Sequence, residues 1–417
     1  MRSTLVSTAL LLVLFGASLA GAAVSCGDCH QTKLSGAHSG APCGLCHLPG
    51  AGFLRPSAAA TGAVGCVGCH RGYEGIFRQA MGQRDAEQAF VARTYGRHDP
   101  HFYQKNCGSC HVGDCLDCHG LDGHSIARPQ RDDCSACHQG YFTGADYYGL
   151  APREDHMRYQ RGLSYGGENY LKMLPDAHAV AGLDCGDCHS MRSLAQGQGA
   201  SRSCTDCHQP DPQVLEHSIA AHLEKLECYA CHSAWAAQEY GTFYLRLGEN
   251  PFGGDYFRVR RSEGAEYVKS AYLKRQDAPP LGLNARGKVS PIRPQFISYY
   301  SDLRSDRVRG VENRLLGAEW KAFFPHTIQR GTVLCDGCHG QPGRFLLEID
   351  EARIYQLQRD GLVLESFWRQ SGQQVSNGGF FDPVRFERIS TKSPLYIKAY
   401  VEKWKTLIER VEAPSKP

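Results

Sequence analysis

Ten copies of one short motif decide what this chain can fold into. All 20 cysteines of the 417 residues fall into C-x-x-C pairs, and every pair is followed at once by histidine. No cysteine is left over for a disulfide framework or a thiol nucleophile. The pairs are Cys26/Cys29, Cys43/Cys46, Cys66/Cys69, Cys107/Cys110, Cys115/Cys118, Cys134/Cys137, Cys185/Cys188, Cys204/Cys207, Cys228/Cys231 and Cys335/Cys338.

C-x-x-C-H is the attachment signature of c-type haem. Two cysteines three positions apart lie on one side of a helical turn, so both reach the porphyrin vinyl groups, and the next residue directs its imidazole at the iron. Zinc sites and redox dithiols do not need histidine in that position, so they do not explain ten repeats. We therefore expect ten covalent haem c groups and their iron. The expected proximal ligands are His30, His47, His70, His111, His119, His138, His189, His208, His232 and His339.

Nine histidines remain, close to one for each haem. A second axial histidine gives a low-spin iron suited to electron transfer. A lone histidine in an ordinary protein is more often a surface or core residue, but the near match in number makes these nine candidate distal ligands. They are His38, His98, His101, His124, His156, His178, His217, His222 and His326.

At least one haem is left without a distal histidine, and three outcomes stay open. A methionine could fill the position, the candidates being Met81, Met157, Met173 and Met191. A lysine or the N-terminal amine could fill it. Alternatively, the position is open to a small molecule, as a catalytic haem requires.

The motifs are distributed unevenly. Nine lie within the 207 residues from Cys26 to His232, a density at which porphyrins rather than side chains are expected to supply most of the buried apolar surface. We expect a multihaem cytochrome c fold of mostly short helices and irregular chain wrapped round stacked haems, with little sheet. The predicted parts are a signal peptide (1–23), a nine-haem electron-transfer domain (24–238) and a haem-poor α+β region with the tenth haem (239–417).

Two patterns describe the haem-poor region. Residues 243–247 and 256–260 alternate like half-buried strands. Near the C-terminus, apolar residues at helical spacing predict an amphipathic helix packed on the body, with a partner or membrane-surface face as the alternative. They are Ile397, Tyr400, Val401, Trp404, Leu407, Ile408 and Val411.

The first residues predict export. A weakly basic start precedes an apolar run that ends in small residues, with cleavage expected near Ala20 or Ala23. The run is shorter than the roughly 20 apolar residues that span a bilayer, which disfavours a membrane anchor. We expect a periplasmic protein, or one at the cell surface or outside the cell, with no transmembrane segment in the mature chain.

Charge excludes nucleic acid as a partner. The formal net charge of the polypeptide is +3. Ten haems, each with two propionates and one positive ferric charge, would change it to about −7. The expected partners are redox proteins, either a quinol-linked cytochrome or a terminal reductase; the sequence does not predict an oligomeric state.

From Cys26 to His339 the chain resembles the exported multihaem c-type cytochromes of anaerobically respiring bacteria. The segment 226–235, LECYACHSAW, is similar to segments of cytochromes in metal, selenite and tellurite reduction systems. Pentahaem nitrite reductases carry a C-x-x-C-K motif and octahaem sulfite reductases a widely spaced cysteine pair, and both are missing. Resemblance to octahaem tetrathionate reductases would imply a lysine ligand, for which Lys105, Lys172 and Lys225 are candidates.

Three functions are compatible with this sequence. The favoured one is an electron relay in anaerobic respiration, between a quinol-linked donor and a terminal reductase or extracellular acceptor. The second is a terminal reductase of a small sulfur, nitrogen or selenium oxyanion, acting at the haem that lacks a distal histidine. The third is a subunit of a cytochrome filament. The sequence favours a carrier over an enzyme and identifies no catalytic residue.

Overall fold

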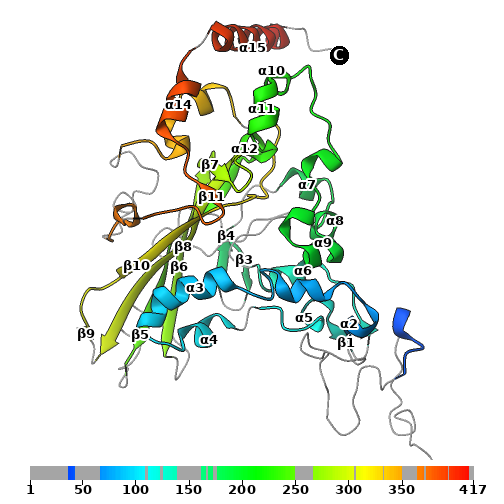
Figure 1. Ribbon diagram of the computed structural model, residues 1–417, viewed down its shortest axis with the longest axis vertical. Helices are drawn as coiled ribbons and strands as arrows, with labels where there is room; N and C mark the ends of the chain where they lie inside the picture. The colour runs from blue at the N-terminus through cyan, green and yellow to red at the C-terminus, as the bar shows by residue number, and fades with distance from the viewer. Residues whose placement is uncertain are drawn as a thin grey trace, which may run out of the picture.

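The computed structural model describes most of the chain (Figure 1). The described residues are 36–42, 66–108, 111–122, 125–138, 161–165, 168–171, 176–248, 266–304, 307–331, 333–349, 364–370, 372–392 and 394–412.

Each described motif forms about one helical turn. The backbone N–H of the histidine donates to the carbonyl of the first cysteine, as in His70 to Cys66 at 2.8 Å and His189 to Cys185 at 2.9 Å. Such an i to i−4 bond closes one turn and places the two cysteines and the histidine around it. The motif turns are α2 (Cys66–Cys69), α5 (Leu116–His119), α6 (Arg131–Ser135), α8 (Cys185–Cys188), η7 (Cys204–Asp206), α12 (Cys228–His232) and α13 (Asp336–His339).

The other helices are also mostly short, as expected. They are η1 (Gly36–His38), η3 (Glu74–Arg78), α3 (Asp85–Arg93), η4 (Tyr95–Arg97), α4 (Phe102–Asn106), α7 (Ala177–Val180), α9 (Met191–Gln196), η6 (Gln198–Ala200), α10 (Leu215–Ser218), α11 (Ala220–Lys225), η9 (Pro342–Phe345), η12 (Phe367–Arg369), α14 (Pro383–Ser390) and α15 (Pro394–Glu412).

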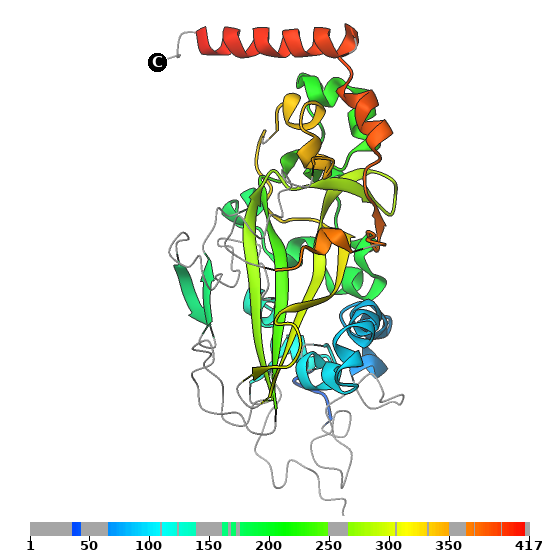
Figure 2. The same ribbon diagram turned by 90° about the vertical axis from the view of Figure 1, so that its left-hand side faces the viewer.

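A twisted sheet occupies the centre of the molecule (Figures 1 and 2). Its strands are β5 (Trp235–Leu247), β6 (Tyr267–Asp277), β7 (Leu281–Asn284), β8 (Val289–Arg304), β9 (Arg307–Val308), β10 (Arg314–Ala322) and β11 (Gly378–Gly379). They follow the order β11-β7-β8-β5-β6, with β9 and β10 also paired to β8. The long strand β8 runs parallel to β5 and antiparallel to β10. Two hairpins lie outside this sheet, β1 (Leu121–Asp122) with β2 (Ser125–Ile126), and β3 (Arg161–Tyr165) with β4 (Glu168–Leu171).

The sheet is more extensive than the sequence predicted, and it carries a conventional side-chain core. Ile292, Ile297, Tyr299 and Trp320 are fully buried with Phe367 in one cluster. The alternating segment 243–247 lies in β5 as expected, whereas 256–260 lies outside the described residues. The predicted division between residues 238 and 239 falls inside β5, and the domain assignment stays a prediction.

The motif-rich part also packs side chains on the sheet, in a second apolar cluster, although porphyrins were expected to supply most of its buried apolar surface. Tyr95 and Phe102, next to α3 and in α4, stack at 4.5 Å between ring centroids and pack on Tyr244 and Tyr300 of the sheet. The physical reason is spacing: residues 71–106 contain no motif and are long enough to form α3, η4 and α4. This layer attaches the haem-bearing chain to the sheet.

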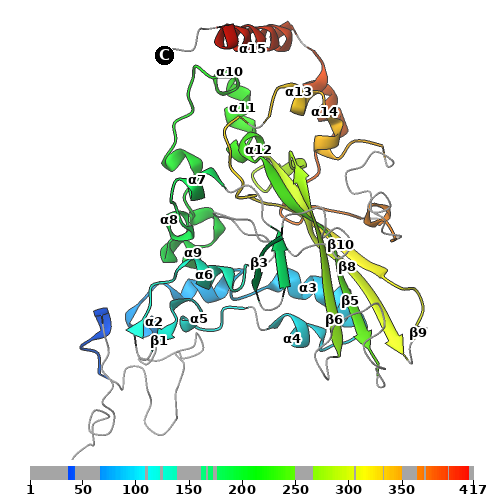
Figure 3. The same cartoon turned by 180° about the vertical axis from the view of Figure 1, so that it is seen from behind.

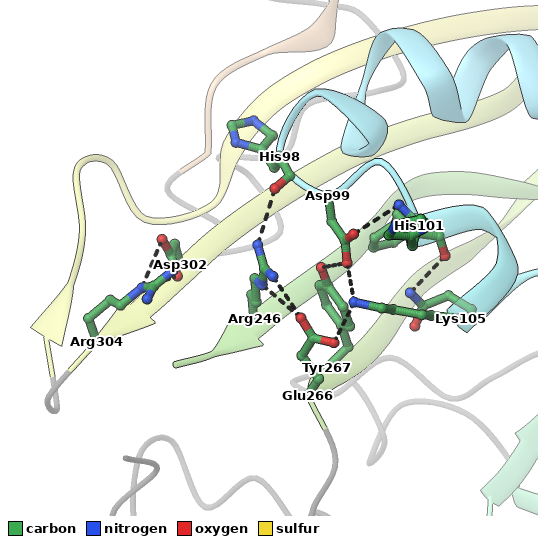
Figure 4. Close-up of polar contacts among 11 residues, drawn as sticks. His98, Asp99, His101, Lys105, Arg246, Glu266, Tyr267, Asp302 and Arg304 are labelled. Carbon is green, nitrogen blue, oxygen red and sulfur yellow. Dashed lines mark hydrogen bonds and ion pairs between the residues drawn. The ribbon is translucent and has the colours of Figure 1, made fainter. Parts of the chain in front are cut away.

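Buried charges fix the same junction (Figure 4). The Asp99 carboxylate accepts hydrogen bonds from Lys105 Nζ at 2.7 Å and from the Tyr267 hydroxyl at 2.8 Å. Lys105 also pairs with Glu266 at 2.7 Å, and Glu266 accepts from Arg246 at 2.7 Å. Burial opposes ionisation of Asp99, but the hydrogen bonds outweigh it and lower the pKa of that carboxyl to about 2.

We expect Asp99→Asn to lower the free energy of unfolding by about 1–3 kcal/mol at neutral pH, because it removes charge-assisted hydrogen bonds at a buried position. Since the folded pKa lies below the ordinary value of 3.8, this stabilisation is present above about pH 4 and is lost as pH falls toward 2. Thermal unfolding of both proteins at pH 7 and at pH 3 measures it. Asp302→Asn is the matched control, because Asp302 pairs with half-exposed Arg304 at 3.3 Å and should cost less than about 1 kcal/mol. An equal effect of both substitutions would contradict the prediction.

Candidate haem-binding sites

Eight of the ten motif histidines lie in the described residues. His30 and His47, with Cys26, Cys29, Cys43, Cys46 and also Cys110, lie outside them, so the first two sites are not described. Among the motif cysteines that the structure does describe, none forms a disulfide. Haem c would bind them through thioether bonds.

The sixth motif keeps the expected helical turn, although Cys137 lies just beyond the end of its helix. Helix α6 ends at Ser135, and the side chain of Cys137 is exposed. The physical reason is that a capping box at Gln130 starts α6 three residues ahead of Cys134, which places the motif at the end of the helix. The backbone N–H of His138 still donates to Cys134 O at 3.0 Å and closes the turn. Haem attachment at Cys137 therefore stays a prediction.

Three more predicted attachment cysteines have side chains that the polypeptide leaves exposed. These three residues are Cys69, Cys207 and Cys228.

Five motif histidines face a second histidine at nearly the same distance. The distances between ring centroids are 5.9 Å for His38–His70 and His178–His208, 6.0 Å for His217–His232, and 6.2 Å for His189–His326 and His222–His339. In each pair one member belongs to a C-x-x-C-H motif and the other is a predicted distal ligand.

This spacing fits a metal ion held between two imidazoles. An imidazole nitrogen binds a first-row metal at about 2 Å, so two rings on opposite sides of one ion have centroids about 6 Å apart. Direct hydrogen bonding between two rings would bring them closer. The residues present therefore fit a six-coordinate haem iron with two histidine ligands at these five places.

Hydrogen bonds orient the rings. In six of the described histidines, leaving His111 aside, Nδ1 lies within hydrogen-bond distance of an oxygen, which leaves Nε2 to bind metal. The partners are Ala127 O for His119 (3.1 Å), Asp176 Oδ1 for His178 (2.9 Å), Ser201 Oγ for His189 (2.9 Å), Glu216 O for His222 (3.2 Å), Gln329 O for His232 (3.1 Å) and Ile389 O for His339 (2.6 Å).

His326 shows the strongest local constraint. Its backbone adopts φ +52°, a left-handed conformation that costs a non-glycine residue about 1 kcal/mol or more. Phe324 packs edge-on against its ring at 4.6 Å, and burial lowers the pKa of His326 to about 4. The imidazole is therefore neutral, the form that binds iron. The chain between β10 and α13 adopts a strained turn that directs this ring at His189.

Two other candidate distal ligands are placed differently (Figure 4). His98 is exposed and stacks on Tyr300 at 4.5 Å between ring centroids. His101 is exposed at the start of α4, where its backbone N–H donates to Asp99. In the part of the chain that the structure describes, neither is brought beside a motif histidine. His124 and His156 lie outside the described residues.

The structure gives little support to methionine or lysine as the axial ligand of the haem that lacks a distal histidine. Lys105 is engaged by Asp99 and Glu266, and Lys225 is exposed at the end of α11. Met81 and Met191 are half-buried, and Met157, Met173 and Lys172 lie outside the described residues.

His111 has a different environment. The Tyr103 hydroxyl lies 2.6 Å from its Nε2, and Glu87 Oε2 lies 3.9 Å from the same atom. Arg84 pairs with Glu87 at 2.6 Å. Burial and the nearby Arg84 charge lower the pKa of His111, and burial raises that of Tyr103. The nitrogen that a C-x-x-C-H motif offers to iron thus faces a phenol and a carboxylate.

The cysteines of neighbouring motifs lie close to one another. The sequence predicted such proximity only for the fourth and fifth motifs, where three residues separate His111 from Cys115. The first cysteines of neighbouring motifs lie within hydrogen-bonding reach of each other in three pairs, Cys66/Cys115, Cys134/Cys185 and Cys204/Cys228. Second cysteines are electrostatic neighbours in three more, Cys118/Cys137, Cys188/Cys207 and Cys231/Cys338. Together they order seven motifs as third, fifth, sixth, seventh, eighth, ninth and tenth.

The two kinds of pair alternate along this row. Each motif inside the row therefore has its first cysteine near one neighbouring motif and its second cysteine near the other. Figures 1 and 3 show the same order in space, from α2 and α5 at one end, past α6, α8 and α7, to α12 beneath α15. The row runs along the sheet, which acts as its support.

The comparisons with known proteins agree with the motif chemistry. Residues 166–245 match the model of the class III cytochrome c family. This segment contains the motifs at Cys185, Cys204 and Cys228 together with His178, His217 and His222. Searches of curated proteins and of solved structures gave no match to this chain. The segment is thus similar to a family of multihaem electron-transfer cytochromes, whose haem c is covalently bound.

Among the described residues, none of the helices is both long and apolar enough to cross a membrane.

Proposed function

We propose that this chain is an exported decahaem c-type cytochrome. It relays electrons in anaerobic respiration between a quinol-linked donor and a terminal reductase or extracellular acceptor. The observation that carries the proposal is the repeated pair of histidines, five times at 5.9–6.2 Å between ring centroids. Two fixed imidazoles on one iron exclude substrate and favour a low-spin centre.

Haem iron supplies the ferric/ferrous couple that carries the electron. The polypeptide positions the motifs and the axial histidine rings. The fold brings the cysteines of neighbouring motifs close to one another, and the Nδ1 hydrogen bonds orient the axial rings, so little rearrangement accompanies a change of charge. The row of motifs from α2 to α13 gives the relay two separated ends.

The test is the spin state of iron in the oxidised holoprotein. We expect electron paramagnetic resonance to show mostly low-spin ferric haem, with low-spin signals from at least the five haems that have paired histidines. A spectrum dominated by high-spin iron would contradict the relay.

A second function is favoured by one observation, the placement of Tyr103 and Glu87 at Nε2 of His111. An iron bound at Nε2 would displace the Tyr103 hydroxyl, which lies 2.6 Å from that atom. It would leave Glu87, 3.9 Å from the same atom and with Arg84 close by, where the other sites have a second histidine. This is the place at which a small oxyanion would bind and be reduced. Adding nitrite or sulfite to the oxidised protein tests it: a perturbed high-spin signal that Tyr103→Phe alters supports the reductase, and an unchanged spectrum rejects it.

A further inference from the structure

Helix α15 leaves an apolar face uncovered at one end of the molecule. Five of its apolar side chains are 43–85% exposed, namely Ile397, Val401, Trp404, Ile408 and Val411. They recur at intervals of three and four residues, so they form one stripe along the helix, about 21 Å long at 1.5 Å per residue. Figure 2 shows α15 lying across the end of the molecule, with one side turned to the other elements.

The side of α15 about a quarter turn round from the stripe attaches the helix to the tenth motif. The Tyr396 and Tyr400 hydroxyls donate to the two carboxylate oxygens of Asp336, at 2.7 and 2.8 Å. Asp336 lies between the cysteines of that motif, and the Tyr396 ring lies 5.1 Å from the His339 ring. Lys403 pairs with Glu216, which also accepts from the thiol of Cys335. The helix is therefore fixed to the last site of the row while its stripe faces outward.

Composition and charge favour one occupant of this stripe. Residues 383–417 contain eight lysines and arginines against four glutamates. Lys398 and Lys405 are seven residues apart and lie next to the stripe on the side away from the body. Lys405 pairs with Glu402 at 3.6 Å, but both side chains of that pair are more than half exposed, so both lysines can extend toward lipid phosphates. An apolar face with a tryptophan, next to basic residues, is typical of a helix that lies in the plane of a membrane surface.

A second copy of the chain fits less well. Five side chains of this kind present roughly 100 Å² apiece. The resulting face of roughly 500 Å² is smaller than the about 800 Å² per partner that stable protein interfaces bury. A lipid surface does not require a matching shape or a minimum area.

We propose that α15 is a membrane-surface helix that binds anionic lipid and holds the tenth haem at the bilayer. That electrons enter or leave the row of haems at this tenth haem depends on the function proposed above. The binding of lipid by α15 does not depend on it. The membrane end of the relay is then the Cys335–His339 motif, within about one helix diameter of the headgroups.

Sedimentation of the full-length holoprotein with phospholipid vesicles tests this. We expect binding to phosphatidylcholine vesicles that contain phosphatidylglycerol, weaker binding to phosphatidylcholine alone, and a decrease with salt. Trp404→Ser with Ile408→Ser should weaken binding on the order of tenfold or more. Lys398→Glu with Lys405→Glu should weaken it only on anionic vesicles.

Leu395→Ser is the matched control, because Leu395 is 80% exposed but lies on the other side of the helix from the stripe. It should bind as the unchanged protein does. The proposal is overturned if the Trp404/Ile408 variant binds vesicles normally, if the unchanged protein does not bind, or if these two substitutions instead dissociate a dimer in solution. Haem content and spin state are measured in parallel. Failure of the electron-relay proposal would change the spin state, whereas failure of the membrane proposal would change only the binding to vesicles.

Discussion

Replacing His326 by alanine converts one low-spin haem to a high-spin one. His326 faces His189 at 6.2 Å between ring centroids, and the strained backbone at φ +52° directs it there. Without this imidazole the seventh haem keeps only His189. We expect the high-spin ferric signal to rise by about one haem per chain, with the haem content unchanged.

Two further variants separate ligation from structure. His326→Met should restore low-spin iron and raise the potential of one haem on the order of 0.2 V, because thioether sulfur favours the ferrous state. His98→Ala is the matched control, since His98 is exposed and stacks on Tyr300. If His98→Ala produced the high-spin signal and His326→Ala did not, the pairing would be wrong.

Removing the seventh motif interrupts the row in its middle. Cys185 contacts Cys134 of the sixth motif, and Cys188 is next to Cys207 of the eighth. In a Cys185→Ala/Cys188→Ala protein we expect nine haems in two separate groups. After a laser flash injects one electron per molecule, the slowest redistribution among haems should be on the order of tenfold slower or more.

Cys335→Ala/Cys338→Ala is the control for that experiment. It also leaves nine haems, but it removes the last motif of the row, so the remaining sites stay contiguous and redistribution keeps its rate. Circular dichroism checks that both variants are folded. Equal rates in the two variants would show that electrons do not follow the order of the cysteine contacts.

The sequence predicted the chemistry of the sites better than their arrangement. The C-x-x-C-H spacing is local, since one helical turn brings Cys185, Cys188 and His189 together. The residues alone therefore predict haem attachment, and the match of residues 166–245 to a cytochrome family agrees with that prediction. The pairing of His326 with His189 joins residues 137 positions apart through a turn beyond β10. No short-range pattern encodes that contact, although the number of spare histidines indicated that such contacts exist.

The sheet was underestimated for a similar reason. Haem density in residues 26–232 suggested that side chains would form little core, yet Phe102 and Tyr95 come from a stretch without motifs and pack on Tyr244. The sequence around an apolar residue in such a stretch does not indicate whether its side chain packs on a porphyrin or on a β-sheet. The amphipathic pattern of 397–411 correctly predicted helix α15, but it did not reveal that Tyr400 contacts the tenth motif while the five residues of the stripe are exposed.

The most direct test of the whole account is the number of haems on each mature chain. A pyridine haemochrome assay, set against the protein concentration from amino-acid analysis, counts the covalently bound porphyrins. We expect ten per polypeptide, one for each C-x-x-C-H motif. A protein without Soret absorption, or with far fewer haems than motifs, would contradict the central claim that tethered haems occupy the spaces between these histidines.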